Sequence, residues 1–376
     1  MILAALGYAF IAFSSFAQLL TVAIVAGRVT KRVRRKAVAH APKVSLLRPV
    51  RGIENFIEEE IETSFQLAYP NLEIILCVDE ESDPIVPIVR RLIARYPEAG
   101  ARLLVGRDTV SGNPKVNNLW KGWQAATADW IILSDSNALL PRDYVECLFD
   151  RWAKGVGVVS HATIAVRPEG FVADLECALM NSYQARWALA GDSLGRHYAL
   201  GKTLMWRRDT VEAAGGYRLL GEEAAEDISS TLALRRVGLV PRLALKPLPQ
   251  AIGRRRLGDV WQRQLRWAQV RRSGLPGVYA AEPIGAVATT AVVAILLGAT
   301  GSFPWWVLPV LLAVWYGSEL ALIRIAGWPL SWRTPVAFVV RDVLVPAIWL
   351  AGWTGRQLDW RGNTVSLARR RKRAAE

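Results

Sequence analysis

Cysteine is scarce in this sequence, and the three that occur, Cys77, Cys147 and Cys177, are scattered. Their odd number and wide spacing argue against a disulfide framework or a zinc knuckle, and they are expected to be reduced, buried thiols of a cytoplasmic domain. The chain also lacks an internal repeat, a low-complexity tract and a recognisable nucleic-acid-binding motif. No glycine stands at the required distance before Gly201-Lys202-Thr203, which excludes a phosphate-binding P-loop.

Acidic residues are outnumbered, with 33 Asp and Glu against 47 Lys and Arg and a net charge of +14. Such an excess is typical of proteins that bind nucleic acid or an anionic membrane surface. Its location favours a membrane and no nucleic acid, because basic residues gather after an apolar stretch and at the C-terminal end. They are Arg28, Lys31, Arg32, Arg34, Arg35, Lys36 and Arg369, Arg370, Arg371, Lys372, Arg373.

The first of the apolar stretches, Ile2–Ala26, is long enough to cross a bilayer. The positive charge follows it instead of preceding it, so an uncleaved anchor with a cytoplasmic C-terminal side is predicted in place of a signal peptide. Ile284–Thr300 and Phe303–Ile323 are predicted to cross as a hairpin. Pro335–Trp353 carries Arg341 and Asp342 in its middle, which is costly in lipid unless they pair or face protein, so this segment is expected to be interfacial or re-entrant.

Between residues 44 and 160, short runs typical of β-strands alternate with stretches whose apolar residues have helical spacing. Short β-rich runs occur at Val44–Leu47, Leu72–Val78, Ala101–Val105, Trp130–Leu133 and Val156–Ser160. Stretches with helical spacing lie between them, at Ile53–Phe65, Pro84–Tyr96, Lys115–Ala126 and Pro141–Trp152. This alternation predicts an α/β fold with a mostly parallel sheet covered on both faces, in which ligands bind beyond the carboxyl ends of the strands. Further helices are expected at Phe171–Leu189, Ala225–Val237 and Leu257–Ser273.

Polar residues follow two of the predicted strands. Asp83 comes after Leu72–Val78 and could accept hydrogen bonds from a base or a ribose, although Asp before Pro84 is also a good helix cap. Asp135 and Asn137 come directly after Trp130–Leu133, where oxygen ligands could hold a hard cation on a diphosphate. A capped turn is the alternative for this second pair.

Two further candidates lie at predicted helix starts. Lys115 could neutralise a phosphate, although Gly112-Asn113-Pro114 before it also reads as an ordinary turn. Asp227 could act as a general base for an acceptor hydroxyl, although the helix dipole alone explains acidic residues at this position.

The predicted helix Leu257–Ser273 carries Arg263 and Arg266 on one face, followed by Trp267. Two guanidinium groups suit a departing diphosphate, and Trp267 could line an acceptor site. A basic amphipathic helix resting on a bilayer is the second interpretation, and both can hold. His161 ends a predicted strand and could contact the acceptor, although a lone histidine is more often structural.

The order of these residues resembles the "D, D, D, (Q/R)xxRW" signature of the family-two-like inverting glycosyltransferases, and more closely the ceramide glucosyltransferases. The likeness rests on Val44–Gly52, Asn113–Leu119, Ser134-Asp135-Ser136, Val156–His161, Ala225-Glu226-Asp227 and Arg263-Gln264-Leu265-Arg266-Trp267. Two departures stand out. Asn137 replaces the second aspartate of the usual Asp-x-Asp motif, and Arg263 stands where processive synthases usually carry glutamine. Ala199–Thr203 is closer to bacterial relatives than to the animal enzymes.

The resemblance implies a GT-A fold, a UDP-sugar donor and Mg²⁺ or Mn²⁺. It implies that Asp83 binds the uridine, that Asp135 with Asn137 holds the metal, and that Asp227 is the catalytic base. Arg263, Arg266 and Trp267 would stabilise the leaving diphosphate and shape the acceptor site. The implied reaction moves glucose or a related hexose onto the primary hydroxyl of ceramide with inversion, giving a β-glycoside.

The sequence leaves alternatives for function. Other acceptors are a hopanoid, a diacylglycerol or a polyprenyl phosphate, and a non-enzymatic membrane docking protein is an alternative of another class. The expected organisation is an anchor (1–27), a cytoplasmic GT-A domain (28–256), an interfacial helix (257–276), membrane helices (284–353) and a basic tail (354–376). The protein is expected to cross a bacterial inner membrane several times.

Overall fold

The computed structural model describes residues 2–32, 41–355, 357–360 and 363–366, and the chain divides into two compact units. The sheet unit comprises residues 32–164, 194–253 and 356–376, and the helical unit comprises residues 1–31, 165–193 and 254–355. The basic residues 34–36, which follow the predicted anchor, and 369–373, which belong to the predicted tail, lie outside the described residues.

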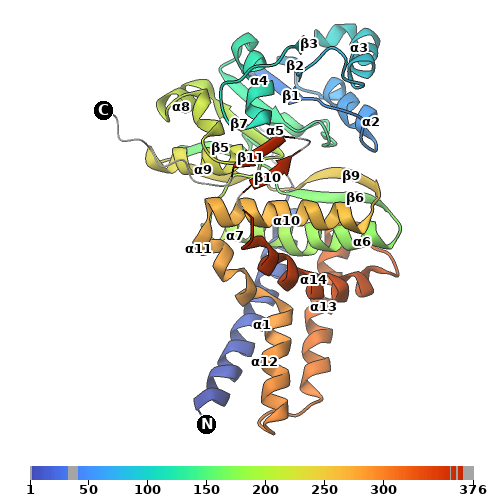
Figure 1. Ribbon diagram of the computed structural model, residues 1–376, viewed down its shortest axis with the longest axis vertical. Coiled ribbons are helices and arrows are strands. Elements are labelled where there is room, and N and C mark those ends of the chain that lie inside the picture. The colour runs from blue at the N-terminus through green and yellow to red at the C-terminus, as the bar shows by residue number, and fades with distance from the viewer. Residues whose placement is uncertain (1, 33–40, 356, 361–362, 367–376) are drawn as a thin grey trace. The chain divides into compact units, whose positions relative to one another are not determined.

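Among the described residues, the sheet unit is built on seven strands in the order β3-β2-β1-β4-β7-β5-β8; Figure 1 labels β1, β2, β3, β5 and β7 of this sheet. They are β1 (Val44–Pro49), β2 (Leu72–Val78), β3 (Arg102–Val105), β4 (Trp130–Ser134), β5 (Val156–Ser160), β7 (Thr203–Arg207) and β8 (Val240–Leu243). Only β7 runs antiparallel to its neighbours, β4 and β5. The mostly parallel sheet and its first five strands are therefore confirmed. Strands β7 and β8 were not predicted, because their part of the sequence shows no clear strand or helix periodicity.

Helices cover both faces of this sheet. They are α2 (Ile57–Glu62), α3 (Val86–Arg95), α4 (Pro114–Ala125), α5 (Tyr144–Phe149), α8 (Arg208–Ala213) and α9 (Glu226–Arg236), with short helices η1 (Thr63–Gln66), η2 (Pro97–Ala99) and η4 (Tyr217–Gly221). Successive side chains of a strand point to opposite faces. Leu47 accordingly packs in one core cluster with Leu119 of α4, and its neighbour Leu46 packs in another with Tyr144 of α5. Both faces of β1 are buried, and Ser45 and Arg48 are the two polar residues of this otherwise apolar strand.

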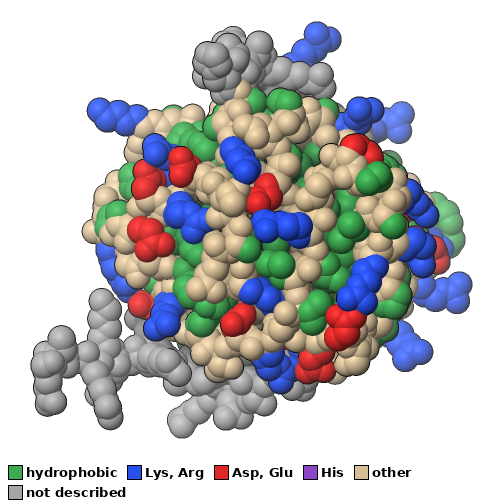
Figure 2. Space-filling model, turned by 90° about the horizontal axis from the view of Figure 1, so that it is seen from above, with side chains coloured by type: hydrophobic (Ala, Val, Ile, Leu, Met, Phe, Trp, Pro, Cys, Tyr) green, Lys and Arg blue, Asp and Glu red, His purple; other side chains and the backbone are tan. Residues whose placement is uncertain are grey.

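The surface of the sheet unit carries both signs of charge. Exposed ion pairs include Arg91 with Glu58 at 2.7 Å and Arg90 with Glu81 at 2.5 Å. On the face drawn in Figure 2, blue basic and red acidic side chains are interspersed with apolar and neutral ones. The positive excess of the chain is therefore not gathered into a single patch on this face.

The helical unit brings together three separate stretches of the chain. Its elements are α1 (Ile2–Val29), α6 (Phe171–Cys177), η3 (Ala178–Ala185), α7 (Arg186–Ser193), α10 (Leu257–Gly274), α11 (Pro276–Ala281), η5 (Glu282–Gly285), α12 (Val287–Ala299), α13 (Val307–Ala326) and α14 (Thr334–Gly352). Among the described residues there are also two small two-stranded sheets, β6 (Thr163–Glu169) with β9 (Leu248–Arg254), and β10 (Gln357–Trp360) with β11 (Asn363–Ser366), of which the second belongs to the sheet unit.

Residues 165–193 differ from the expected organisation, which placed them inside the domain 28–256. They form α6, η3 and α7 in succession, η3 being a π-helical segment, and they group with α1 and the C-terminal helices. One physical reason is the buried ion pair between Arg28 of α1 and Asp192 of α7, whose atoms lie 2.8 Å apart. Arg28, counted in the sequence as part of a basic run facing the membrane surface, is 5% exposed.

Three helices of the described part of the chain are long and apolar enough to cross a membrane, namely α1, α13 and α14. Residues 276–285 and α12 reach the same length and composition together, as a pair bent by 50°. Figure 1 shows α1, α12 and α13 side by side, while α14 lies across one end of them with α10 and α6. An interfacial position for residues 335–353 stays a prediction, since α14 also has the length and composition of a span.

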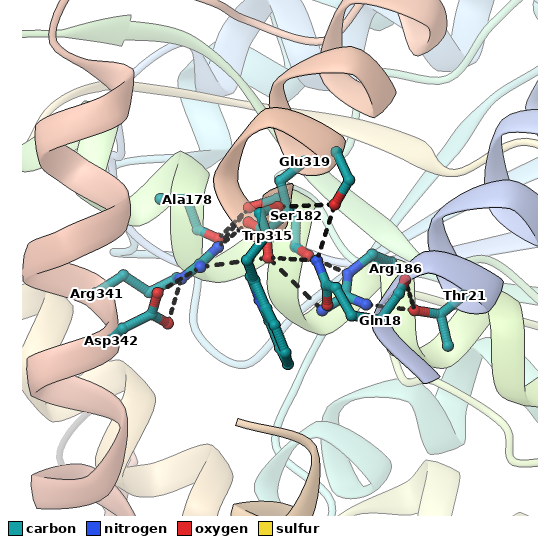
Figure 3. Close-up of polar contacts among 10 residues, drawn as sticks. Gln18, Thr21, Ala178, Ser182, Arg186, Trp315, Glu319, Arg341 and Asp342 are labelled. Carbon is teal, nitrogen blue, oxygen red and sulfur yellow. Dashed lines mark hydrogen bonds and ion pairs between the residues drawn. The ribbon is translucent and has the colours of Figure 1, made fainter. Parts of the chain in front are cut away.

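A network of charged and polar side chains is buried in the helical unit (Figure 3). Arg341 of α14 donates to Glu319 of α13 at 2.6 Å and to Asp342 at 2.8 and 2.9 Å. Glu319 also accepts from Gln18 of α1 at 3.2 Å and lies 3.7 Å from Arg186 of α7. The condition set by the sequence, that Arg341 and Asp342 must pair, is met, because the network balances two arginines against two carboxylates.

Candidate active site

The carboxyl ends of the parallel strands place several predicted site residues at one edge of the sheet. Asp135 directly follows β4, His161 directly follows β5, and Asp83 lies in the loop after β2. Strand β7 runs the other way, so the residues just before it, Gly201 and Lys202, arrive at the same edge. The amide of Asp135 donates to the carbonyl of Lys202 at 3.0 Å.

Lys115 is the centre of the cluster. Its ammonium lies 2.5 Å from Asp135 Oδ1 and 2.5 Å from Glu226 Oε1, and it donates to the carbonyl of Gly201 at 2.8 Å. Burial alone would lower the pKa of Lys115, but the Asp135 and Glu226 carboxylates raise it above its usual value. Lys115 is therefore a fixed cation of this site.

The start of α4 fixes the position of Lys115. Asn113 caps the helix by accepting hydrogen bonds from the amides of Lys115 and Val116. Further along α4, a Cβ on Gly122 would lie 2.6 Å from Cys77 Sγ of β2, so only glycine lets the helix pack this close to the sheet. The turn-like residues of Gly112-Asn113-Pro114 thus serve as the helix cap that presents Lys115.

Lys202 is a second cation at Asp135. Its Nζ lies 3.3 Å from Asp135 Oδ2 and donates to Asn137 Oδ1 at 2.6 Å. The Asn137 amide nitrogen donates in turn to Glu54 Oε2 at 3.1 Å, which orients its oxygen toward Lys202. Each carboxylate oxygen of Asp135 thus faces a different lysine.

Asp227 lies beside this cluster, in the first turn of α9. Its carboxylate accepts from the amides of Gly201 and Ile228, both at 2.8 Å. Desolvation, and then the neighbouring Glu226 carboxylate, raise the pKa of Asp227 to about 7. A Cβ on Gly201 would lie 2.9 Å from Glu226 Oε1 and 3.3 Å from Asp227 Oδ2, so a side chain at that position would displace both carboxylates.

Asp83 ties two strand ends together. Its Oδ1 accepts from the amide of Gly52, which follows β1, and from the amide of Ile85, both at 2.9 Å. Asp83 therefore acts in part as the predicted helix cap, because it accepts from the amide of Ile85 just before α3. Asp83 sits at the same edge of the sheet as Asp135, and uridine binding stays a prediction.

Arg48 organises the loop that carries Asp135. It is fully buried in β1, and its guanidinium donates to the carbonyls of Asp135 and Ser136 at 2.8 Å and of Ala138 at 3.1 Å. Burial lowers the pKa of Arg48 to about 10. No role was predicted for Arg48, although an arginine inside a strand that is buried on both faces must find buried acceptors.

His161 is buried and stacks on the ring of Tyr144, with centroids 5.4 Å apart. Burial lowers its pKa to about 3, so the imidazole is neutral at physiological pH. Its Nδ1 has no hydrogen-bond partner among the described residues. Contact with an acceptor stays a prediction.

The remaining predicted residues lie on α10 of the helical unit. Arg263 donates to Glu176 of α6 at 2.7 Å, and Arg255 lies 2.9 Å from the other oxygen of that buried carboxylate. Arg266 and Trp267 are half-buried. The structure thus brings Lys115, Asp135, Asn137 and Asp227 together in the sheet unit, and holds Arg263 in an ion-paired group of the helical unit.

The oxygen set at Asp135 fits a metal that is shared with a ligand. Among the described residues, no group of three or more His, Cys, Asp or Glu side chains could hold a metal ion. Asp135 and Asn137 do present two side-chain oxygens beside the strand edge. A hard cation completes its coordination with water and phosphate oxygens, so these residues suit a cation that a diphosphate helps to hold.

The chain is similar over most of its length to a family of known proteins. The family described as "Glycosyl transferase family 21" matches residues 7–373. Ceramide glucosyltransferase 3 of Caenorhabditis elegans is 24% identical over 339 residues, covering 87% of this chain and 73% of that protein. The ceramide glucosyltransferase of Komagataella phaffii is 28% identical over 288 residues, covering 68% of this chain and 56% of that protein.

A solved structure shares the fold. The mannosyltransferase PcManGT from Pyrobaculum calidifontis, in complex with GDP-Man and Mn²⁺, superposes with a TM-score of 0.51 at 20% identity. The likeness covers 91% of this chain and 98% of that one, and it confirms the GT-A-like class of the fold. With the family match extending over nearly the whole chain, the protein belongs to glycosyltransferase family 21 and is a nucleotide-sugar-dependent glycosyltransferase.

Proposed function

We propose that this protein transfers a glucosyl group from UDP-glucose to the primary hydroxyl of ceramide, with inversion at the anomeric carbon. Family membership and relatives named ceramide glucosyltransferase support the acceptor and the sugar. The apolar helices α1, α13 and α14 support a reaction at a membrane, where a lipid acceptor resides.

The main support for the proposal is that a candidate base, Asp227, lies next to a candidate diphosphate site at Asp135. Asp227 and Asp135 are linked through Lys115, Glu226 and Gly201 within one chain of hydrogen bonds and ion pairs. A base with a pKa of about 7 is matched to proton transfer from a hydroxyl at neutral pH.

The reaction is a single displacement. The Asp227 carboxylate takes the hydroxyl proton, and the hydroxyl oxygen bonds to the anomeric carbon from the face opposite the diphosphate. The bond from that carbon to the diphosphate oxygen breaks, and its electron pair leaves with UDP. Lys115 keeps positive charge next to this leaving group.

A divalent cation, Mg²⁺ or Mn²⁺, between Asp135 and the diphosphate would offset the charge that develops on UDP. Asn137 is the second residue proposed to contribute to that site. Asp83 is proposed to bind the uridine, and His161 to contact the acceptor. Arg263 and Arg266 are proposed to stabilise the diphosphate, and Trp267 to shape the acceptor site.

The acceptor and the donor sugar are tested together. Membranes containing the protein are incubated with several UDP-sugars and a panel of ceramide, hopanoid, diacylglycerol and polyprenyl phosphate, and the products are identified by mass spectrometry. The proposal predicts β-glucosylceramide as the main product. A main product on another lipid replaces ceramide as the acceptor, and no product together with no UDP-sugar binding overturns the proposed function.

The sheet unit is proposed to face the cytoplasm, with the helical unit in the inner membrane of a bacterium. The basic residues Lys31 and Arg32 follow α1 directly, and positive charge beside a span favours the cytoplasmic side.

A further inference from the structure

We propose that Lys202 keeps the divalent cation away from Asp135 until the nucleotide diphosphate is present, so that cation and donor bind together. The inference deepens the proposed function, because it rests on a cation binding at Asp135 during transfer. Lys202 is not among the residues predicted from the sequence to form the site.

The first argument is position. Lys202 Nζ lies 3.3 Å from Asp135 Oδ2 and 2.6 Å from Asn137 Oδ1, the two oxygens predicted to bind the metal. A divalent cation would lie about 2.0–2.6 Å from such oxygens. An ammonium and a cation cannot both occupy the space between them, so one excludes the other.

The second argument is that the backbone holds Lys202 in place. Strand β7 pairs with β4 in a register that sets Thr203 opposite Ser134, and the amide of Asp135 donates to the carbonyl of Lys202 at 3.0 Å. The base of the side chain is therefore fixed next to Asp135, while its four-carbon stem can still turn the ammonium away. Lys115, in contact with two carboxylates at 2.5 Å, is held more tightly.

The third argument is charge. Asp135 is ion-paired through both oxygens, with Lys115 at 2.5 Å and Lys202 at 3.3 Å, so a cation arriving alone meets a carboxylate that already has two cationic partners. A diphosphate brings negative charge that attracts the cation and offers the Lys202 ammonium a new anionic partner. Displacement of Lys202 from Asp135 is therefore favoured when both arrive together.

The test measures Mn²⁺ binding to the full-length protein in detergent, from the EPR signal of free Mn²⁺, without nucleotide and with UDP. Wild type is expected to bind Mn²⁺ weakly alone and tightly with UDP. Lys202→Met should bind Mn²⁺ alone at least about ten-fold more tightly than wild type, because a repelling charge is removed. Lys202→Arg should behave like wild type, and Lys154→Met, which removes an exposed lysine of the sheet unit, is the matched control.

Equal nucleotide-free Mn²⁺ binding by Lys202→Met and wild type overturns the proposal, as does tight Mn²⁺ binding by wild type without UDP. Lys202→Gln repeats the measurement should the Met variant fail to fold, as judged by thermal unfolding. The nucleotide-free arm requires neither sugar nor lipid, so its outcome is separate from the proposed function, which fails if wild type binds no UDP at all.

Discussion

At the scale of single residues, the chemistry proposed here depends on the ionisation of Asp227. We expect Asp227→Asn to lower kcat by about 10²–10⁴-fold, because the amide cannot take the hydroxyl proton. Binding of UDP with Mn²⁺, measured by calorimetry, should persist in this variant. Normal turnover by Asp227→Asn would remove Asp227 from the role of base.

The pH dependence of the reaction follows from the pKa of about 7. Below pH 7 the carboxyl is protonated and cannot act as a base, so kcat/KM should fall as the pH drops through 7. Glu226→Gln removes a neighbouring negative charge that raises the pKa of Asp227, so the fall in kcat/KM on the acid side of the pH profile, its acid limb, should move to lower pH. Glu222→Gln, at an exposed carboxylate in the preceding loop, should leave the limb where it is.

The raised pKa of Asp227 also makes the stability of the fold depend on pH. The folded protein binds the Asp227 proton more tightly than the unfolded chain, so this group stabilises the fold most at low pH. Its contribution to the free energy of unfolding declines as the pH rises from about 4 to about 7.

Gly201 provides a steric test of the same cluster. Because a Cβ would press on Glu226 and Asp227, we expect Gly201→Ala to lower kcat by about a hundred-fold through misplacement of the base. Gly277→Ala in α11, where a Cβ meets no atom within 4 Å, is the control. Both variants are assayed for lipid product, and retained activity in Gly201→Ala would show that the cluster tolerates displacement.

The sequence indicated much of this residue-level picture. The order of Asp83, Asp135, Asp227 and Arg263-Gln264-Leu265-Arg266-Trp267 predicted a shared site, and the structure places Asp135 and Asp227 of this set in one cluster around Lys115. Lys202 could not be found in this way, because its contact with Asp135 depends on β7 entering the sheet antiparallel between β4 and β5. Pairing between strands about 70 residues apart leaves no local periodicity to read.

At the scale of elements, the buried network of the helical unit joins α1, α7, α13 and α14. We expect Arg341→Met to cost roughly 3–5 kcal/mol of stability, because it leaves Asp342 buried without its guanidinium partner. The double variant Arg341→Met with Asp342→Leu should recover much of that loss, since Glu319 and Arg186 still balance each other.

Thermal unfolding in detergent measures this effect. Arg324→Met, which removes an exposed arginine from the last turn of α13, serves as the control and should unfold like wild type. Unfolding of Arg341→Met at the wild-type temperature would mean that the network adds no stability.

Element boundaries were predicted well where the local pattern was strong. The five expected strands and the helices α3, α4, α9 and α10 occur where periodicity placed them. The π-helical form of η3 was not predicted, and neither was its long-range partner Arg341, which donates to Ser182 at 2.7 Å. No sequence period encodes such a partner.

At the scale of the whole molecule, the proposed topology can be tested by labelling. Tyr8 of α1 and Phe303 of the loop between α12 and α13 are in ring contact, with centroids 5.7 Å apart, so this loop and the start of α1 share one end of the helical unit. We expect Trp305→Cys in this loop to react with an impermeant maleimide from the periplasmic side. Lys154→Cys should react only in inverted vesicles. The reverse pattern would invert the assigned orientation.

The helical unit is assembled from three stretches that are far apart in the sequence, and this constrains the order in which it can fold. Gln18 meets Glu319 across 301 positions, and Arg186 must find that same glutamate. During synthesis α1 and α7 therefore leave the ribosome long before α13 and α14 can complete their hydrogen bonds. A fragment comprising residues 28–256 would keep α6 and α7 but lose α1, which packs on α7, and α10 and α14, which pack on α6, so buried side chains of both helices would be left exposed.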